Sequence, residues 1–173
     1  MPSRQDHGFS LIELLIVVAI LSVITAIATP GLLRARMTSN EASAIASLKI
    51  TTSAQVAYSA SCGNGAYAPS FVVLATPVTP GGPGFLSEDL GKSVVPLKTG
   101  FQFTLTPAVG GTPGPNDCNG SATTTKYYAT GVPVGFQQTG TRSFAVTSAG
   151  TIWQLTTPAA PVEPFGPPAT PIQ

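Results

Sequence analysis

The chain has 173 residues, enough for one domain with an anchor, and only 9% of them are charged, against about 25% in an ordinary soluble domain. The formal net charge is +1, so the overall charge gives no reason to expect a nucleic acid as partner. A surface with few charges tends to self-associate, which is a liability for a free enzyme but useful to a subunit of an assembly.

Residues 1–8 form a short polar segment that contains His7, the one histidine of the chain. We interpret this segment as a leader peptide and exclude it from the fold. The sequence Gly8-Phe9-Ser10-Leu11-Ile12-Glu13 follows, and residues 14–33 then contain no charge. As a helix, this apolar run would be about 30 Å long, the thickness of the hydrocarbon core of a bilayer. A charged residue at the edge of a membrane span is a functional candidate, which singles out Glu13.

These residues resemble the N-terminus of type IV pilins and pseudopilins, in which a leader ending in glycine precedes a phenylalanine, a glutamate and an apolar helix. The resemblance implies that a prepilin peptidase cuts between Gly8 and Phe9 and methylates the new amine of Phe9. It also implies that Glu13 assists assembly. In a medium of low dielectric constant, the Glu13 carboxylate of one subunit would pair with the Phe9 amine of its neighbour and set the axial register. The alternatives are that Glu13 reaches the membrane interface or is protonated.

The fold that the resemblance implies is α+β, with a long N-terminal helix packed on a small antiparallel sheet of three or four strands. The expected divisions are the leader 1–8, a membrane-spanning or filament-core half of the helix over 9–33, and an amphipathic half over 34–60. A globular head, 61–157, and a proline-rich tail, 158–173, follow. Beyond about Ser61 the resemblance depends on this layout more than on a motif.

Ala26-Ile27-Ala28 has the small-x-small form of an ordinary signal-peptidase site. A cut there would release a soluble secreted binding module that begins at Thr29. Two features argue against this alternative: Glu13 falls where the apolar core of such a signal begins, and Pro30 lies two residues beyond the cut.

The positive charges near the span argue for the opposite orientation to that of the family. Arg34 and Arg36 after the span outweigh Arg4 before it, which by the positive-inside rule places the C-terminal part in the cytoplasm. We follow the family, because a threonine-rich domain that is compatible with a disulfide suits the outside.

The expected location is then the bacterial inner membrane with the head outside, followed by a surface or periplasm-spanning filament. The expected partners are other copies of the chain, prepilin peptidase, an inner-membrane assembly platform and membrane lipid, with no nucleic acid.

Pro30-Gly31 interrupts the apolar pattern, because proline removes a helical hydrogen bond and glycine adds local freedom. We expect a kink or a segment that can unwind, with a break between two helices as the alternative. From residue 32 to about residue 60 the helical pattern resumes. The stripe predicted to pack on the sheet is Ile45, Leu48, Thr52 and Val56, whereas Glu41, Lys49 and Ser53 fall on other faces.

Cys62 and Cys118 are the two cysteines, and an even count in an exported chain favours one disulfide. It would close a loop of about 57 residues and contribute roughly 4 kcal/mol in the chain-entropy model. Two separate thiols are the alternative. Glycine after Cys62 favours the end of the long helix at this point.

Residues 66–100 read as irregular, with apolar side chains from Tyr67 to Leu74 packing on the head and a helical turn at 85–90 capped by Ser87. Alternation of apolar and polar residues predicts strands near 101–106, 125–130, 142–147 and 151–155, with Ser148-Ala149-Gly150 as a hairpin loop. Residues 158–173 contain six prolines, which predicts an extended or disordered, solvated tail.

No arrangement of residues predicts catalysis, because the one histidine lies in the leader and no base can be assigned to any serine or threonine. Acids near Asp117, Glu88 and Glu163 do not predict a metal site, and we expect no cofactor. Asn119-Gly120-Ser121 fits a glycosylation sequon. The expected function is a structural subunit of a type IV pilus. A type II secretion pseudopilin or a minor pilin is the alternative within the family.

Overall fold

The computed structural model describes residues 9–172. The chain divides into two compact units, Met1–Arg36 and Met37–Gln173, which are described separately below. Helix α1 (Leu11–Ser61) contributes residues to both units. The leader 1–8, with the predicted cleavage residue Gly8, lies outside the described residues.

In the first unit, which contains the N-terminal part of α1, the side chains of residues 9–36 are all exposed. Among the described residues, α1 is the one helix long and apolar enough to cross a membrane. The hydroxyl groups of Ser22, Thr25 and Thr29 donate to the backbone oxygens four residues earlier, at 2.7 Å each. These polar groups therefore need no partner from lipid.

Pro30 lies inside α1, so the alternative of two helices separated by a break is not observed. Proline has no N–H group to donate to the Ala26 carbonyl, which weakens the helix locally. A kink at Pro30-Gly31 stays a prediction.

In the head, α1 buries one face against the sheet, but this face is rotated from the predicted stripe. Leu48 is fully buried as predicted, whereas Val56 is 59% exposed. Glu41, which the pattern placed on another face, is 4% exposed. The reason is that the buried face includes several small and polar residues, which a purely apolar stripe leaves out. It consists of Glu41, Ala44, Ser47, Leu48, Thr51, Ala54, Gln55 and Tyr58.

The head contains a six-stranded antiparallel sheet in which the strands follow the chain order from β1 to β6. Four strands confirm the predicted ones, and the two short edge strands β1 and β6 were not predicted. The sheet is therefore larger than the expected three or four strands. The strands are β1 (Leu97–Lys98), β2 (Phe101–Pro107), β3 (Tyr127–Pro133), β4 (Ser143–Thr147), β5 (Ile152–Leu155) and β6 (Thr170–Pro171).

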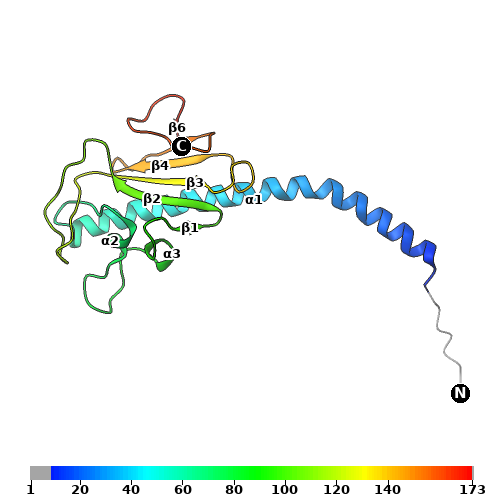
Figure 1. The fold of residues 1–173 in the computed structure, drawn as a ribbon, viewed down its shortest axis with the longest axis horizontal. Coiled ribbons are helices and arrows are strands. Elements are labelled where there is room, and N and C mark those ends of the chain that lie inside the picture. Colours follow the sequence, from blue (N-terminus) through cyan, green and yellow to red (C-terminus); the bar gives the residue numbers. More distant parts are fainter. Residues whose placement is uncertain (1–8, 173) are drawn as a thin grey trace, which may run out of the picture. The chain divides into compact units, whose positions relative to one another are not determined.

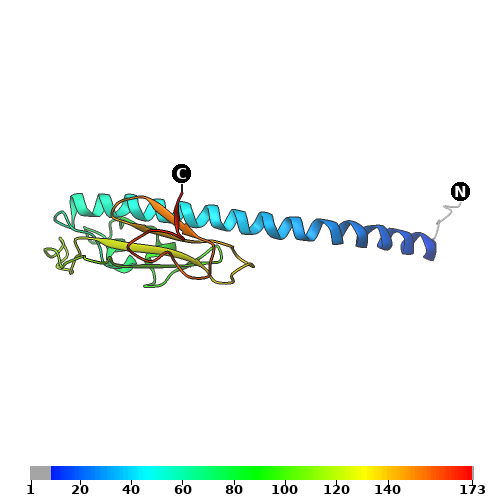
Figure 2. The ribbon, with the colours of Figure 1, turned by 90° about the horizontal axis from the view of Figure 1, so that it is seen from above.

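Figures 1 and 2 show the C-terminal part of α1 running along one face of this sheet. Alternate residues of the central strands point toward the helix, which gives β2 its pattern of buried and exposed positions. At Gly131 in β3, an added Cβ would lie 3.0 Å from the Phe103 ring and 3.8 Å from Leu48. The glycine thus leaves room for Phe103 to lie over the neighbouring strand against α1. The main apolar residues of this layer are Leu48, Tyr58, Phe101, Phe103, Leu105, Tyr127, Phe144 and Val146.

The C-terminal segment 158–172 packs on the other face of the sheet, so the prediction of a solvated tail is wrong for these residues. The Phe165 ring stacks on Trp153 at 5.3 Å and lies 6.2 Å from Tyr128. The Tyr128 hydroxyl donates to the Pro161 carbonyl at 2.5 Å, and β6 pairs with β5. Proline prevents long ladders but does not prevent packing of its ring or of the aromatic residues nearby. We call residues 158–172 the C-terminal strap.

Two short helices, α2 (Phe71–Ala75) and α3 (Glu88–Gly91), lie between α1 and the sheet in the chain order. The first was not predicted as a helix, although Phe71 and Leu74 pack into the core as expected. The second matches the predicted turn, but the Ser87 side chain makes no capping hydrogen bond. Cys62 and Cys118 form the predicted disulfide.

Candidate functional site

The N-terminal motif forms the first turn of α1. Ser10 immediately precedes the helix, and its backbone N–H donates to Glu13 Oε2 at 3.0 Å. The Glu13 N–H donates to the Ser10 carbonyl at 3.1 Å. A glutamate at the third helical position that reaches back to the N-cap is one half of a capping box. The signal in the sequence was Ser-x-x-Glu over residues 10–13, which our sequence analysis did not use.

This geometry gives the Glu13 carboxylate a partner within its own helix. The N-terminal end of a helix carries a partial positive charge and free N–H groups, which stabilise an anion by a few tenths to about 1 kcal/mol. The predicted pairing with an amine at Phe9 concerns the cleaved chain, in which that amine exists. The Phe9 side chain, next to this end of the helix, is 79% exposed.

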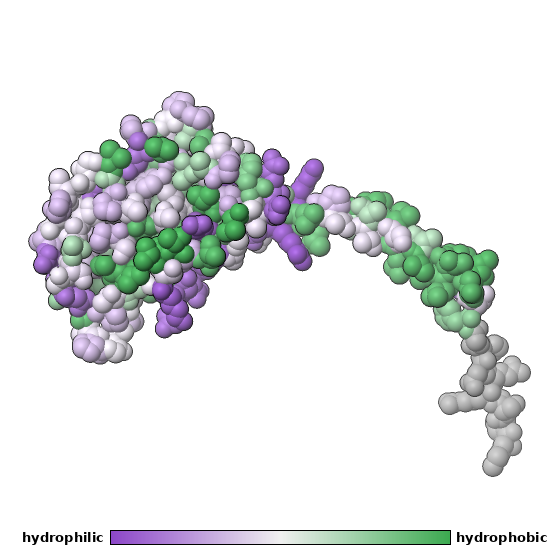
Figure 3. All heavy atoms as spheres, in the orientation of Figure 1, coloured by the Kyte–Doolittle hydropathy of each residue, from purple (hydrophilic) through white to green (hydrophobic). Residues whose placement is uncertain are grey.

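Apolar side chains cover the helix that follows the motif. Leu14, Ile20 and Ile24 are each more than half exposed, at 58%, 55% and 56%. Figure 3 shows hydrophobic residues over the visible surface of this part of α1. Leaving such a side chain in water instead of burying it costs about 1.5–3 kcal/mol, so this segment needs lipid or other protein around it.

Residues 3–29 match the family model of the prokaryotic N-terminal methylation motif. This motif is the signature of type IV pilins and pseudopilins, and with α1 and the antiparallel sheet it supports a pilin-like substrate of prepilin peptidase. The motif and the single apolar N-terminal helix are consistent with membrane anchoring before assembly. Comparison with curated proteins and with solved structures gave no match to this chain.

In the head, α1 is tied to the sheet by an ion pair that the sequence analysis missed. The Glu41 carboxylate accepts hydrogen bonds from Arg142 Nε at 2.8 Å and Nη2 at 2.6 Å, and from the Thr141 N–H and hydroxyl at 2.6 and 2.9 Å. Nearby, Asn40 Nδ2 donates to the Thr139 carbonyl at 3.1 Å. The partners are about 100 residues away in the chain, so no local pattern could reveal them.

Burial by itself raises the pKa of Glu41. This effect is outweighed by hydrogen bonds from the Thr141 backbone, the Arg142 side chain and the Thr141 hydroxyl, and by the charge of Arg142. The pKa of Glu41 is therefore lowered below its ordinary value. Glu41 is therefore ionised at neutral pH. Arg142 also lies 5.6 Å from the centre of the Phe144 ring and donates to Gln154 at 2.7 Å. This helix–sheet ion pair fixes α1 on the head.

A second buried polar cluster anchors the loop that contains Cys118. The Tyr58 hydroxyl on α1 donates to Asp117 Oδ2 at 2.8 Å. Burial, and then the hydrogen bond to the Asp117 carboxylate and its charge, raise the pKa of Tyr58. The tyrosine therefore stays a donor, and the loop is held to α1 both by this bond and by the disulfide to Cys62.

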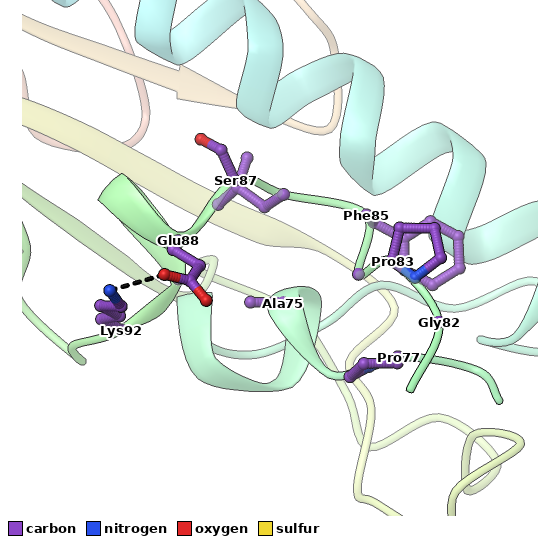
Figure 4. A pocket seen from close by; sticks show the side chains of 11 residues that line it. Ala75, Pro77, Gly82, Pro83, Phe85, Ser87, Glu88 and Lys92 are labelled. Atoms are coloured by element: carbon purple, nitrogen blue, oxygen red, sulfur yellow. Dashed lines mark ion pairs between the residues drawn. The ribbon is translucent and has the colours of Figure 1, made fainter. Parts of the chain in front are cut away.

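A hollow of about 550 Å³ lies beside α2 and α3 in the head (Figure 4). Its lining is mostly glycine, proline and apolar side chains, with an ion pair of 2.6 Å between Glu88 and Lys92. Both side chains of this pair are at least 73% exposed, so it does not resemble a buried catalytic group. Within residues 9–172, no three His, Cys, Asp or Glu residues are grouped so that they could hold a metal ion.

The structure brings together some predicted site residues and leaves others apart. It joins Cys62 to Cys118, and it places Glu13 on the N-terminus of its own helix. It keeps Pro30 and Gly31 inside α1.

Proposed function

We propose that the chain is a structural subunit of a type IV pilus or of a pilus-like filament such as a secretion pseudopilus. The observation that carries the proposal is the methylation motif at residues 3–29, joined to a helix whose apolar side chains are exposed over residues 9–36. In the membrane, lipid covers these side chains. In the filament, the same side chains of other copies cover them.

The chemistry of the proposal is limited to the new N-terminus. Cleavage between Gly8 and Phe9 creates a cationic amine, and methylation leaves it positively charged. The amine lies next to the exposed end of α1, where the Glu13 carboxylate now accepts from Ser10. An incoming subunit whose Glu13 pairs with this amine exchanges a neutral donor for a charged one, which strengthens the hydrogen bond in a medium of low dielectric constant.

The head acts as the outer part of the filament in this proposal. Its many glycines, prolines and threonines provide a neutral surface, and the disulfide and the C-terminal strap stabilise it outside the cell. An enzyme is not part of the proposal, because the motif is that of structural subunits.

The deciding experiment compares Glu13→Ala with Glu88→Ala in the native host. We expect Glu13→Ala to be processed and inserted in the membrane but to form few or no fibres, as seen by electron microscopy of sheared surface material. Glu88→Ala removes an exposed acid of the head and should leave fibre formation unchanged. Normal fibres from Glu13→Ala would remove the role proposed for this carboxylate.

The mature N-terminus distinguishes the proposal from a secreted module. Mass spectrometry of the processed chain should find a methylated Phe9 as the first residue, and Gly8→Ala should leave the precursor uncut. A mature chain that begins at Thr29 would show cleavage by an ordinary signal peptidase and would overturn the proposal.

A further inference from the structure

One short motif in the head is not used by the proposed function. Asn119-Gly120-Ser121 is the one place in the chain where an asparagine is followed, two residues later, by a serine or threonine. An Asn-x-Ser/Thr tripeptide is the acceptor pattern for N-linked glycans. We propose that Asn119 is a glycan attachment site, whose side-chain amide takes a sugar from a diphosphate-activated donor after export of the head.

The backbone of this tripeptide is held in a defined turn. Asp117 Oδ1 accepts the N–H groups of Asn119 at 2.9 Å and of Ser121 at 2.6 Å. Gly120 has φ +80°, a left-handed conformation that glycine adopts without strain, and its N–H donates to the Asp117 carbonyl at 3.0 Å. The backbone donors of the acceptor tripeptide are thus all satisfied by Asp117, and the Asn119 side chain is exposed while Ser121 is partly exposed.

The turn is rigid because Asp117 is anchored on both sides. This residue is 6% exposed, and its second carboxylate oxygen binds the Tyr58 hydroxyl. The next residue, Cys118, forms the disulfide to Cys62 at the end of α1. A turn held in this way presents the Asn119 side chain in the same position in every copy of the protein.

The tip of the turn is open. Asn119 and Gly120 are exposed, and a Cβ added to Gly120 would have no atom within 4 Å, so a bulky group has room there. The Asn119 side chain makes one long hydrogen bond, from Nδ2 to the Pro77 carbonyl at 3.3 Å. An amide nitrogen that carries a sugar keeps one N–H, so glycosylation does not require loss of this bond.

Two other asparagines use their side-chain amides to stabilise the fold. Asn40 Nδ2 donates to the Thr139 carbonyl and Asn64 Nδ2 donates to the Asn116 carbonyl, at 3.1 and 2.8 Å. Neither residue is followed by a hydroxyl residue at the required position. Asn64 also precedes a glycine, as Asn119 does, which makes it a matched control for the experiment below.

The transfer itself needs no redox partner. Nδ2 of Asn119 attacks the anomeric carbon of a sugar linked to a lipid diphosphate. A carbon–nitrogen bond forms while the bond from the anomeric carbon to the diphosphate oxygen breaks. The diphosphate leaves with the electron pair, and one amide proton passes to a base of the transferase. The product would add hydroxyl groups to a chain of which only 9% is charged, and so would oppose non-specific association of the heads.

This inference rests on the proposed function in one respect, that the head is exported. The experiment is intact-mass and peptide mass spectrometry of the chain purified from its native host. We expect a hexose-type mass increase on the peptide that contains Asn119. The increase should be lost completely in Asn119→Gln and in Ser121→Ala, and kept in Ser121→Thr and in Asn64→Gln.

The same spectra report the N-terminus and the disulfide, which keeps the two proposals apart and shows whether each variant folds. An unmodified Asn119 would overturn the inference, whatever the N-terminus is. A mass change that persists in Ser121→Ala would be chemical modification of the Asn-Gly pair, and would overturn it too. A modified Asn119 on a chain that begins at Thr29 would support the inference and contradict the filament.

Discussion

Before residue 37, α1 exposes every side chain that the structure describes, whereas in the head the same helix buries one face against the sheet. Two leucines illustrate the contrast: Leu21 is 56% exposed and Leu48 is 0% exposed. The part with the more apolar composition is therefore the part without a core.

The difference shows that hydrophobic content does not say where a residue finds its partners. The first unit has a charge-free run but too little chain around it to bury that run. The head buries several polar groups, such as Thr51 and Gln55, and each has hydrogen bonds. Gln55 bonds both the N–H and the carbonyl of Ala68, so its burial costs little. In the proposed function, lipid or other copies of the chain cover the first unit, whereas the head forms its own core.

Loss of the disulfide should have the largest effect, and only in the head. The double variant Cys62→Ser with Cys118→Ser should lower the free energy of unfolding by roughly 4 kcal/mol, because the bond closes a loop of sequence separation 56 in the unfolded chain. Denaturant unfolding of the mature chain in detergent, followed by Trp153 fluorescence, measures this. A loss below about 1 kcal/mol would mean that packing alone determines the stability of the head.

The two leucines provide the direct test of the comparison. Leu48→Ala should lower the free energy of unfolding of the head by about 3 kcal/mol, because it removes buried methyl groups and leaves a cavity. Leu21→Ala, in the same helix, should leave that value unchanged in detergent. Equal effects of the two variants would show that both parts of α1 unfold as one cooperative unit.

Glu41→Gln should lower the free energy of unfolding by about 2 kcal/mol at neutral pH. The substitution removes the charge that Arg142 and Thr141 bind but keeps a side chain of similar shape. The Arg142 side chain is 35% exposed, which keeps the effect below that of a fully buried pair. Thermal or denaturant unfolding of the two chains gives the difference. Ser53→Ala, on the exposed face of α1, is the control and should have no effect.

The Glu41 effect should depend on pH in one direction. The folded-state pKa of Glu41 lies below its ordinary value of 4.5, so the unfolded chain binds a proton more readily. The stabilisation is complete above pH 4.5 and is lost as the pH falls through the lower folded-state pKa. Unfolding of wild type and Glu41→Gln should therefore converge at acidic pH, and a difference that grew on acidification would contradict this assignment.

The smallest effect expected is that of the C-terminal strap. Phe165→Ala should lower the free energy of unfolding by about 1 kcal/mol, because the Phe165 ring stacks on Trp153 but is only partly buried. The emission of Trp153 should shift to longer wavelength as water gains access. Unchanged emission and stability would show that the strap does not contribute to the head.

Several features of the molecule could be predicted from neighbouring residues alone. The motif around Glu13 and the apolar run required only the order of residues along one helix. Alternation of apolar and polar residues predicted β2 because this strand buries one face and the side-chain period is two. The two cysteines favoured a disulfide on the expectation that the chain is exported, and the structure contains it.

Other features depended on residues far apart in the chain. Glu41 is buried because Thr141 and Arg142, which immediately precede β4, bind its carboxylate, whereas an isolated helical pattern places a glutamate in solvent. The strap packs because Trp153 and Tyr128 project from the sheet toward Phe165, which no count of prolines reveals.

The sequence by itself determined the positions of the apolar helix, the processing motif and the main strands, because these features depend on residues that are close together in the chain. Only the tertiary structure decided which face of α1 is buried, that a glutamate can be buried there, and that the proline-rich end covers the sheet. The physical reason is that a buried polar or aromatic group is stable only with its partner, and these partners come from distant segments.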